Sequence, residues 1–151
     1  MQKKFNREEI DSIIPQSDPF LFLDEATIDG DIAIATYKIR GDEFFLKGHF
    51  KDNPVFPGTL MFEALGQLGV LYVLASGNAS FTQEIDPSTI FFISTENMRC
   101  QRICRPSETL TLEIKPVRIR HPMFAFEGKI SVGNERTAFV ERATLTFDYK
   151  K

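Results

Sequence analysis

One apolar block dominates this sequence and constrains how the rest of the chain can fold. Across residues 60–75 the only strongly polar side chains are Glu63 and Gln67. Pro57 and Gly58 stand immediately before the block, as expected at the start of a helix. A helix that is apolar on all sides is either a buried central helix or a membrane span. Because the block is shorter than a typical span of ~20 residues and contains a carboxylate, we predict a buried helix and no membrane span.

The remaining sequence predicts a sheet that covers this helix. Asp29-Gly30 separates two apolar runs at 26–28 and 32–39, which is typical of a β-hairpin. After a polar loop at 76–88, the chain becomes rich in β-branched, aromatic and alternating segments. These candidate strands are 89–94, 109–114, 122–127, 129–132, 137–140 and 143–149.

Two short segments near the N-terminus carry their own signals. Asn6 and Glu9 have the spacing of a capping box, and the isoleucines that follow predict a short helix over 6–14. The apolar run at 20–23 predicts a short buried strand or turn. Taken together, we expect an α+β fold and a single domain over residues 1–151, with a mostly antiparallel sheet of five or six strands packed on one long helix.

The composition argues against several classes of protein. Lys and Arg number 18 against 21 Asp and Glu, a net charge of −3, whereas nucleic-acid-binding domains are usually basic. The two cysteines and two histidines have no recognisable zinc spacing, so we expect no metal. Two cysteines are too few for a disulfide scaffold, and residues 1–9 are polar where a signal peptide needs an apolar run. We therefore expect a cytoplasmic protein.

Glu63 is the first candidate for catalysis. A carboxylate in an apolar helix must pair or take up a proton, because burial of its charge is costly. The raised pKa that follows suits a proton donor near neutral pH. Gln67 is four residues further on, hence on the same helix face, where it can hydrogen-bond Glu63 or a ligand. The alternative is that Glu63 is a structural residue bonded to the backbone.

His49 and Gly58 supply the other groups that an enolate-forming reaction requires. His49 lies in the loop before the helix, and histidine is the usual general base. Gly58 opens the helix with an unobstructed backbone N–H, which can stabilise a developing oxyanion. Phe56 and Phe62 are candidates to line an apolar tunnel. An exposed or structural histidine is the alternative, because spacing alone does not bring these groups together.

A family signature is recognisable between His49 and Gln67. Its motifs are His49-Phe50, Pro54-Val55-Phe56-Pro57-Gly58, Glu63-Ala64 and Gln67. Their order and spacing resemble those of the 3-hydroxyacyl-(acyl-carrier-protein) dehydratases of type II fatty-acid synthesis. The resemblance extends over most of the chain, including residues 19–24, 96–99 and 106–108.

This resemblance implies a hot-dog fold, in which a sheet wraps a long central helix. It implies a homodimer, or a higher oligomer such as a trimer of dimers, in which His49 of one subunit and Glu63 of the other share each active site. His49 would be the catalytic base, Glu63 the catalytic acid and Gly58 the amide donor to the thioester carbonyl. From their positions in the chain, we also assign Gln67 and Phe56 to substrate binding. That substrate would be carried on the phosphopantetheine of an acyl carrier protein, with no other cofactor.

The sequence departs from the family pattern in three places. Gln16-Ser17-Asp18 replaces a His-Arg-aromatic segment, and Lys51-Asp52 replaces Pro-Gly. The basic-aromatic stretch after the helix is altered at 99–105, which contains Cys100 and Cys104, two cysteines that we expect to pack. The catalytic motif is intact while segments that shape the tunnel or contact the carrier have changed. This pattern fits a specialised pathway, such as aryl-polyene or polyketide-like assembly, as well as fatty-acid synthesis.

A basic segment on this acidic chain predicts where an acidic carrier docks. Residues 99–120 carry six basic and two acidic side chains, a net charge of +4 against −7 for the rest of the chain. A basic patch can steer one acidic partner while the remaining surface repels others. We assign the docking to Arg99, Arg102 and Arg105. The alternative is that these arginines form a solvated strand face.

Three functions are compatible with these residues. The first is a lyase that dehydrates 3-hydroxyacyl carrier-protein thioesters to trans-2-enoyl thioesters. The second is a hot-dog acyl thioesterase, which needs a carboxylate-activated water and no histidine at position 49. The third is a non-catalytic acyl-binding module. The intact pair of His49 and Glu63 favours the lyase.

Overall fold

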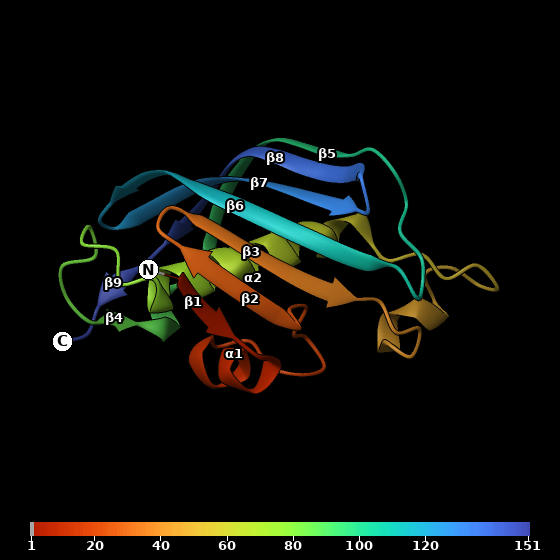
Figure 1. The fold of residues 1–151 in the computed structure, drawn as a ribbon, viewed down its shortest axis with the longest axis horizontal. Helices are drawn as coiled ribbons and strands as arrows, with labels where there is room; N and C mark the ends of the chain where they lie inside the picture. The colour runs from red at the N-terminus through yellow and green to blue at the C-terminus, as the bar shows by residue number, and fades with distance from the viewer. Residues whose placement is uncertain (1) are drawn as a thin grey trace.

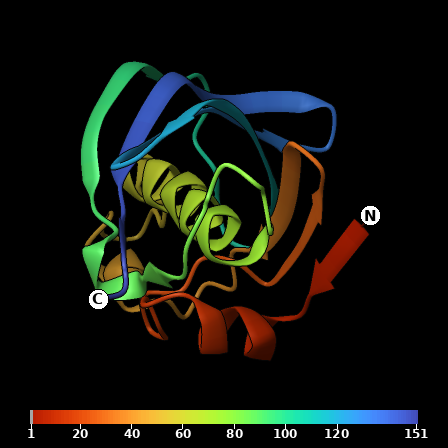
Figure 2. The same cartoon turned by 90° about the vertical axis from the view of Figure 1, so that its left-hand side faces the viewer.

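A long helix lies in the hollow of a curved antiparallel sheet, and this pairing organises the molecule (Figure 1). The computed structural model describes residues 2–151. The helix, α2, spans Gly58–Ala75, and Figure 2 shows the strands curving around it. This is the arrangement of a hot-dog fold, so the α+β class predicted from the sequence is confirmed.

The main sheet of the described chain, residues 2–151, contains seven strands, and every pairing in it is antiparallel. In spatial order they are β1 (Gln2–Phe5), β2 (Glu25–Asp29), β3 (Ile32–Lys38), β6 (Thr109–Arg120), β7 (Met123–Val132), β8 (Glu135–Thr146) and β5 (Phe92–Cys100). A two-stranded sheet joins β4 (Ile85–Asp86) to β9 (Asp148–Tyr149). Short helical segments are α1 (Arg7–Ile13), η1 (Phe44–Lys47) and η2 (Pro87–Thr89). β1 and β5 are therefore the edges of the main sheet.

Local signals predicted the N-terminal elements well. Asn6 caps α1: its side-chain oxygen accepts from the Glu9 backbone N–H at 2.9 Å, and the Glu9 carboxylate accepts from the Asn6 N–H at 3.0 Å. This is the predicted capping box. The predicted hairpin joins β2 to β3 and turns at Gly30, whose φ of +63° suits glycine. Residues 20–23 form irregular chain with Leu21, Phe22 and Leu23 buried, so the strand alternative there was wrong.

The second half of the chain forms longer strands than the sequence predicts. Candidate strands 122–127 and 129–132 are one strand, β7, and segments 137–140 and 143–149 are joined over most of their length in β8. The register between β7 and β8 is irregular, which interrupts the alternation of side chains that the prediction relied on. β5 continues to Cys100 because it pairs with β8, and the unpredicted β1 pairs with β2. The main sheet therefore has seven strands where five or six were expected.

The sheet covers α2 unevenly. The helix is long and apolar enough to cross a membrane, with a mean hydropathy of 1.4, but 67% of it is buried inside the protein, as in a core helix. Every residue from Ala64 to Val73 is buried. Gly69 lets the sheet approach closely, since a Cβ there would lie 2.7 Å from the ring of Phe126. In the first half of the helix, Phe62 and Glu63 are only half-buried.

β5 is an exposed edge with apolar side chains. All nine of its residues are exposed, among them Phe92, Ile93 and Met98, and Phe91 immediately before the strand is 64% exposed. An unpaired edge strand of this kind is a template for pairing with another chain. A hollow separates β5 from the first half of α2, so the uncovered edge and the uncovered part of the helix are neighbours.

Candidate active site

The backbone around His49 fixes which ring nitrogen is available to substrate. The Nδ1 atom of His49 lies 2.8 Å from the carbonyl oxygen of Val55, and the Val55 N–H donates to the His49 carbonyl, also at 2.8 Å. A carbonyl oxygen only accepts, so in the neutral ring Nδ1 carries the proton. The Nε2 atom then keeps its lone pair and can accept a proton from a substrate.

The ring of His49 is also held from one side. The Phe50 ring stacks on it, with centroids 3.9 Å apart and planes 28° apart. Phe50 and Asn53 exchange two backbone hydrogen bonds, of 2.9 and 3.1 Å, which close the loop between His49 and Val55. The half-buried imidazole is therefore fixed by one hydrogen bond and one aromatic contact.

Glu63 lies in the second turn of α2, at the half-covered part of the helix. Burial raises the pKa of its carboxyl group, and a hydrogen bond donated by Gln67 at 3.1 Å partly opposes that rise by favouring the ionised form. The net effect is a raised pKa. Glu63 is therefore suited to hold a proton and release it to a substrate.

Gln67 fastens α2 to the irregular segment 20–22. Its side chain is completely buried, its Oε1 accepts from the Phe22 N–H at 2.8 Å, and its Nε2 donates to the Phe20 carbonyl at 3.0 Å. The same Nε2 group donates to Glu63. Because its polar atoms are occupied by the protein itself, Gln67 holds Glu63 in place.

Gly58 is the first residue of α2, where backbone N–H groups have no acceptor within the helix. The preceding Pro57 supplies no side-chain cap. The Sγ atom of Cys100 lies against Gly58, and a Cβ at position 58 would be only 2.7 Å from that sulfur. Glycine at this position therefore allows the Cys100 side chain on β5 to approach the start of the helix closely.

A hollow of about 310 Å³ lies between the first half of α2 and β5. The residues that line it are Thr59, Phe62, Glu63, Phe92, Ile93, Ser94, Thr95 and Met98. Glu63 is its one carboxyl group, and His49 is not part of its lining. Among residues 2–151 there is also no hydrogen bond between His49 and Glu63. Within one chain, this hollow therefore contains the Glu63 carboxyl group and not the His49 imidazole.

The sequence analysis did not anticipate most of this lining. Phe92 fell within the predicted strand 89–94 but was not singled out as a site residue, and Met98 was missed because that strand ended at 94, whereas β5 continues to Cys100. Phe56, proposed as a substrate contact, is completely buried in a cluster with Phe22, Tyr37 and Phe45, and it does not line the hollow.

The three arginines assigned to carrier docking lie in different environments. Arg102 pairs with Glu108 at 2.6 Å and with Glu135 at 3.1 Å. Arg105 donates to the side chain of Asn53. Arg99 is exposed on β5, and within residues 2–151 it forms no ion pair.

Another set of arginines lines a second hollow, of about 450 Å³, beside β5. Arg118, Arg120 and Arg142 border it together with the apolar Ile93 and Met123. In the described part of the chain, none of these three guanidinium groups has an ion-pair partner. His121 also borders this hollow but pairs with Asp148 at 2.8 Å, as an exposed histidine in a turn.

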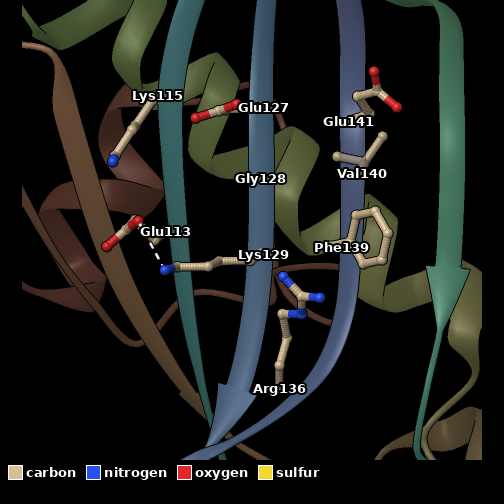
Figure 3. Close-up of a pocket in the computed structure, with 9 residues that line it drawn as sticks. All are labelled: Glu113, Lys115, Glu127, Gly128, Lys129, Arg136, Phe139, Val140 and Glu141. Atoms are coloured by element: carbon tan, nitrogen blue, oxygen red, sulfur yellow. Dashed lines mark ion pairs between the residues drawn. The ribbon is translucent and has the colours of Figure 1, made fainter.

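A third hollow, shown in Figure 3, lies on the face of β6, β7 and β8 that points away from α2. Its charges are balanced, with three glutamates against two lysines and one arginine, and Glu113 pairs with Lys129 at 3.5 Å. Over residues 2–151 no group of three or more His, Cys, Asp or Glu side chains is arranged to hold a metal ion.

The fold is that of a hot-dog protein, with a half-buried carboxyl group near the start of its central helix and a histidine in the loop before that helix. The FabA-like domain family matches residues 14–141. The chain is 33% identical over 150 residues to the 3-hydroxyacyl-[acyl-carrier-protein] dehydratase FabZ of Caulobacter vibrioides, covering 98% of this chain and 92% of that protein. It is 35% identical over 133 residues to FabZ of Halalkalibacterium halodurans, covering 87% and 91%. The chain belongs to the FabA-like family.

Solved structures share the fold at lower sequence identity. The dehydratase heterocomplex ApeI:P of Xenorhabdus doucetiae superposes with a TM-score of 0.74 at 17% identity, covering 93% of this chain and 91% of the other. A thioesterase from Haemophilus influenzae superposes with a TM-score of 0.65, also at 17% identity, covering 97% and 93%. Because both dehydratase and thioesterase structures share this fold, the fold alone does not identify the reaction.

Replacing Gln67 with methionine should destabilise the protein. The Phe22 N–H would lose its partner in a buried hydrogen bond, at a cost of about 1–3 kcal/mol, and the half-buried bond to the Phe20 carbonyl would be lost as well. We expect the free energy of unfolding to fall by roughly 2–4 kcal/mol, measured by urea denaturation. Gln83→Met, at an exposed position, is the control and should change stability by less than about 0.5 kcal/mol. Equal stability of the two variants would refute the anchoring role of Gln67.

Proposed function

We propose that this chain dehydrates 3-hydroxyacyl thioesters carried on an acyl carrier protein and forms trans-2-enoyl thioesters. Two observations carry the proposal: the Nε2 atom of His49 is free to accept a proton, and burial raises the pKa of the Glu63 carboxyl group. Removal of water from a 3-hydroxyacyl group requires one group that accepts a proton and one that donates a proton. Membership of the FabA-like family supports the same reaction.

In this mechanism the Nε2 atom of His49 takes a proton from C2 of the substrate. The negative charge that develops on the thioester oxygen is stabilised by the N–H of Gly58 at the start of α2, where the helix dipole also favours negative charge. Protonated Glu63 gives its proton to the 3-hydroxyl group, which leaves as water while the C2–C3 double bond forms. Transfer of the proton from the His49 imidazolium to the Glu63 carboxylate, through solvent, restores both groups.

The carboxyl and imidazole groups come together, in this proposal, in a homodimer. Pairing of β5 with β5 of a second copy would cover Phe92, Ile93 and Met98, which are exposed in the single chain. The second copy would also cover the open side of the hollow beside Glu63. His49 of one subunit would then serve the Glu63 of the other. A trimer of such dimers is a further assembly compatible with the proposal.

The carrier docks, in this proposal, on the basic face beside β5. Arg99, Arg118, Arg120 and Arg142 have no ion-pair partner in the described chain, whereas Arg102 is already neutralised. Unpaired guanidinium groups attract an acidic protein more strongly than paired ones. We therefore extend the predicted docking surface beyond Arg99, Arg102 and Arg105, and expect the unpaired arginines to contribute most.

The cellular location and the pathway of the enzyme are also part of the proposal. The proposed steps use only side chains and amides of residues 1–151, acting as one domain, and the phosphopantetheine arm belongs to the carrier. We propose a cytoplasmic enzyme, in fatty-acid synthesis or in a related aryl-polyene or polyketide-like pathway. The thioesterase alternative predicts release of a free acid from a saturated acyl thioester, and a binding module predicts no product at all.

The variants His49→Ala and Glu63→Gln should each lose most dehydratase activity while staying folded. Each removes one proton-transfer group, and such a group typically contributes ~10²–10⁴-fold to the rate. Activity is measured as formation of the enoyl thioester, and folding by circular dichroism. His121→Ala and Glu8→Gln make the same chemical changes at exposed positions and should keep activity on a short pantetheine thioester, which does not use the arginine-lined hollow that His121 borders. Near-normal turnover in either site variant would rule out its assigned role.

Mixed dimers test whether the active site is shared between subunits. If His49 and Glu63 act across the interface, dimers with one His49→Ala and one Glu63→Gln subunit retain one intact site of two. We expect such dimers, isolated with two different affinity tags, to recover roughly half of the wild-type activity. A fully active monomer in sedimentation experiments, or inactive mixed dimers, would contradict the shared site.

Charge reversal at Arg99 or Arg118 should weaken use of the carrier-bound substrate. An exposed ion pair contributes about 0.2–1 kcal/mol, so we expect KM to rise roughly 1.4- to fivefold for the carrier substrate and to stay unchanged for a short pantetheine thioester. The control Lys38→Glu makes the same charge change on β3. Added salt should weaken the carrier reaction, since the Debye length falls from ~10 Å at 0.1 M to ~3 Å at 1 M. Equal changes in KM for both substrates would show that the carrier does not dock on these arginines.

A further inference from the structure

A single aromatic ring on β5 lies between the hollow beside Glu63 and the backbone of α2 at Gly66. Phe92 lines this hollow from β5, and its ring reaches α2 at Gly66, where any Cβ would overlap the ring. Gly66 is itself buried, so the ring and the helix backbone are in direct contact. Only a residue without a side chain allows an aromatic ring to approach a helix this closely.

The position of this contact relative to Glu63 determines how much space a substrate has. Gly66 is three residues after Glu63, so it lies nearly one turn further along α2, about 4.5 Å along the helix axis. Three residues further along α2, Gly69 is covered by the side chains of Phe126 and Leu145. The Phe92 ring therefore occupies the space against α2 immediately beyond the turn that carries the carboxyl group.

We propose that Phe92, seated on Gly66, sets the acyl-chain length that this enzyme accepts and restricts it to short chains. The inference rests on the proposed dehydratase function, in which Glu63 contacts the 3-hydroxyl group and the rest of the acyl chain enters the hollow. The remainder of the hollow wall suits an alkyl chain, since Phe62, Ile93 and Met98 are apolar. A longer chain meets the ring of Phe92 and must displace it.

The Phe92 side chain can also be truncated without leaving a cavity in the fully buried core. Its side chain is 42% exposed, unlike Phe126, which is completely buried behind Gly69. Truncation at position 92 therefore extends the hollow along α2 toward Gly66 and leaves the packing at Gly69 intact. Leucine at this position, shorter than phenylalanine and not aromatic, would open the hollow partly.

The test compares 3-hydroxyacyl thioesters of four, eight and twelve carbons on the same carrier protein. For the wild-type protein we expect kcat/KM to be highest with four carbons and to fall with length. In Phe92→Ala, kcat/KM for eight carbons relative to four should rise by about 10–200-fold, because one methylene accommodated in an apolar pocket changes discrimination by that order. Phe92→Leu should give an intermediate ratio. Phe139→Ala removes an aromatic ring from the opposite face of the sheet and should leave the ratio unchanged (Figure 3).

The outcomes separate this inference from the function on which it rests. Absence of enoyl product from the wild-type protein at every length would overturn the dehydratase function, and the length limit with it. Dehydration at all three lengths with equal kcat/KM would overturn the length limit alone. So would an unchanged ratio in Phe92→Ala and Phe92→Leu, provided that four-carbon turnover shows the variants to be folded. A rise in the ratio for both variants, and not for Phe139→Ala, would support it.

Discussion

The uneven cover of α2 is the constraint on which the rest of this structure depends. An apolar helix is stable in water only where its faces are removed from solvent. Strands β7 and β8 bury the second half closely, with Phe126 and Leu145 packed onto Gly69. The sheet then ends at β5, and the first half of the helix is left beside an exposed edge. Glu63 lies in that half, so the geometry that leaves apolar surface uncovered also leaves the carboxyl group within reach of a substrate.

A buried amide connects this helix to the rest of the site. Gln67 is among the few polar side chains in the core, and it bonds the backbone of segment 20–22 as well as Glu63. A fully satisfied buried polar group imposes one arrangement on the elements it joins, because any shift would leave a group unpaired. The direction of the Glu63 side chain is therefore determined by the same contacts that attach the irregular segment to α2.

The sequence predicted the parts of the fold and site that depend on neighbouring residues. The capping box at Asn6, the turn at Gly30 and the helix after Pro57 each follow from local chemistry. The union of short candidate strands into β7 and β8, and the length of β5, depend on partners far along the chain. For the same reason Phe56, a tunnel candidate by sequence, lies in an aromatic cluster. The ion pairs of Arg102 with Glu108 and Glu135 could likewise not be predicted from the sequence.

Strand β5 links assembly to specificity in this protein. Its side chains form the exposed edge that a second subunit would cover, and the same strand contributes Phe92 to the hollow beside Glu63. A substitution on this strand can therefore alter chain-length preference directly, or alter activity by shifting the proportion of dimers. Dimerisation depends on protein concentration, whereas the ratio of kcat/KM for two chain lengths at one concentration does not depend on the number of active dimers. That ratio thus isolates the role of the hollow from that of the interface, and the two roles of β5 can be measured separately.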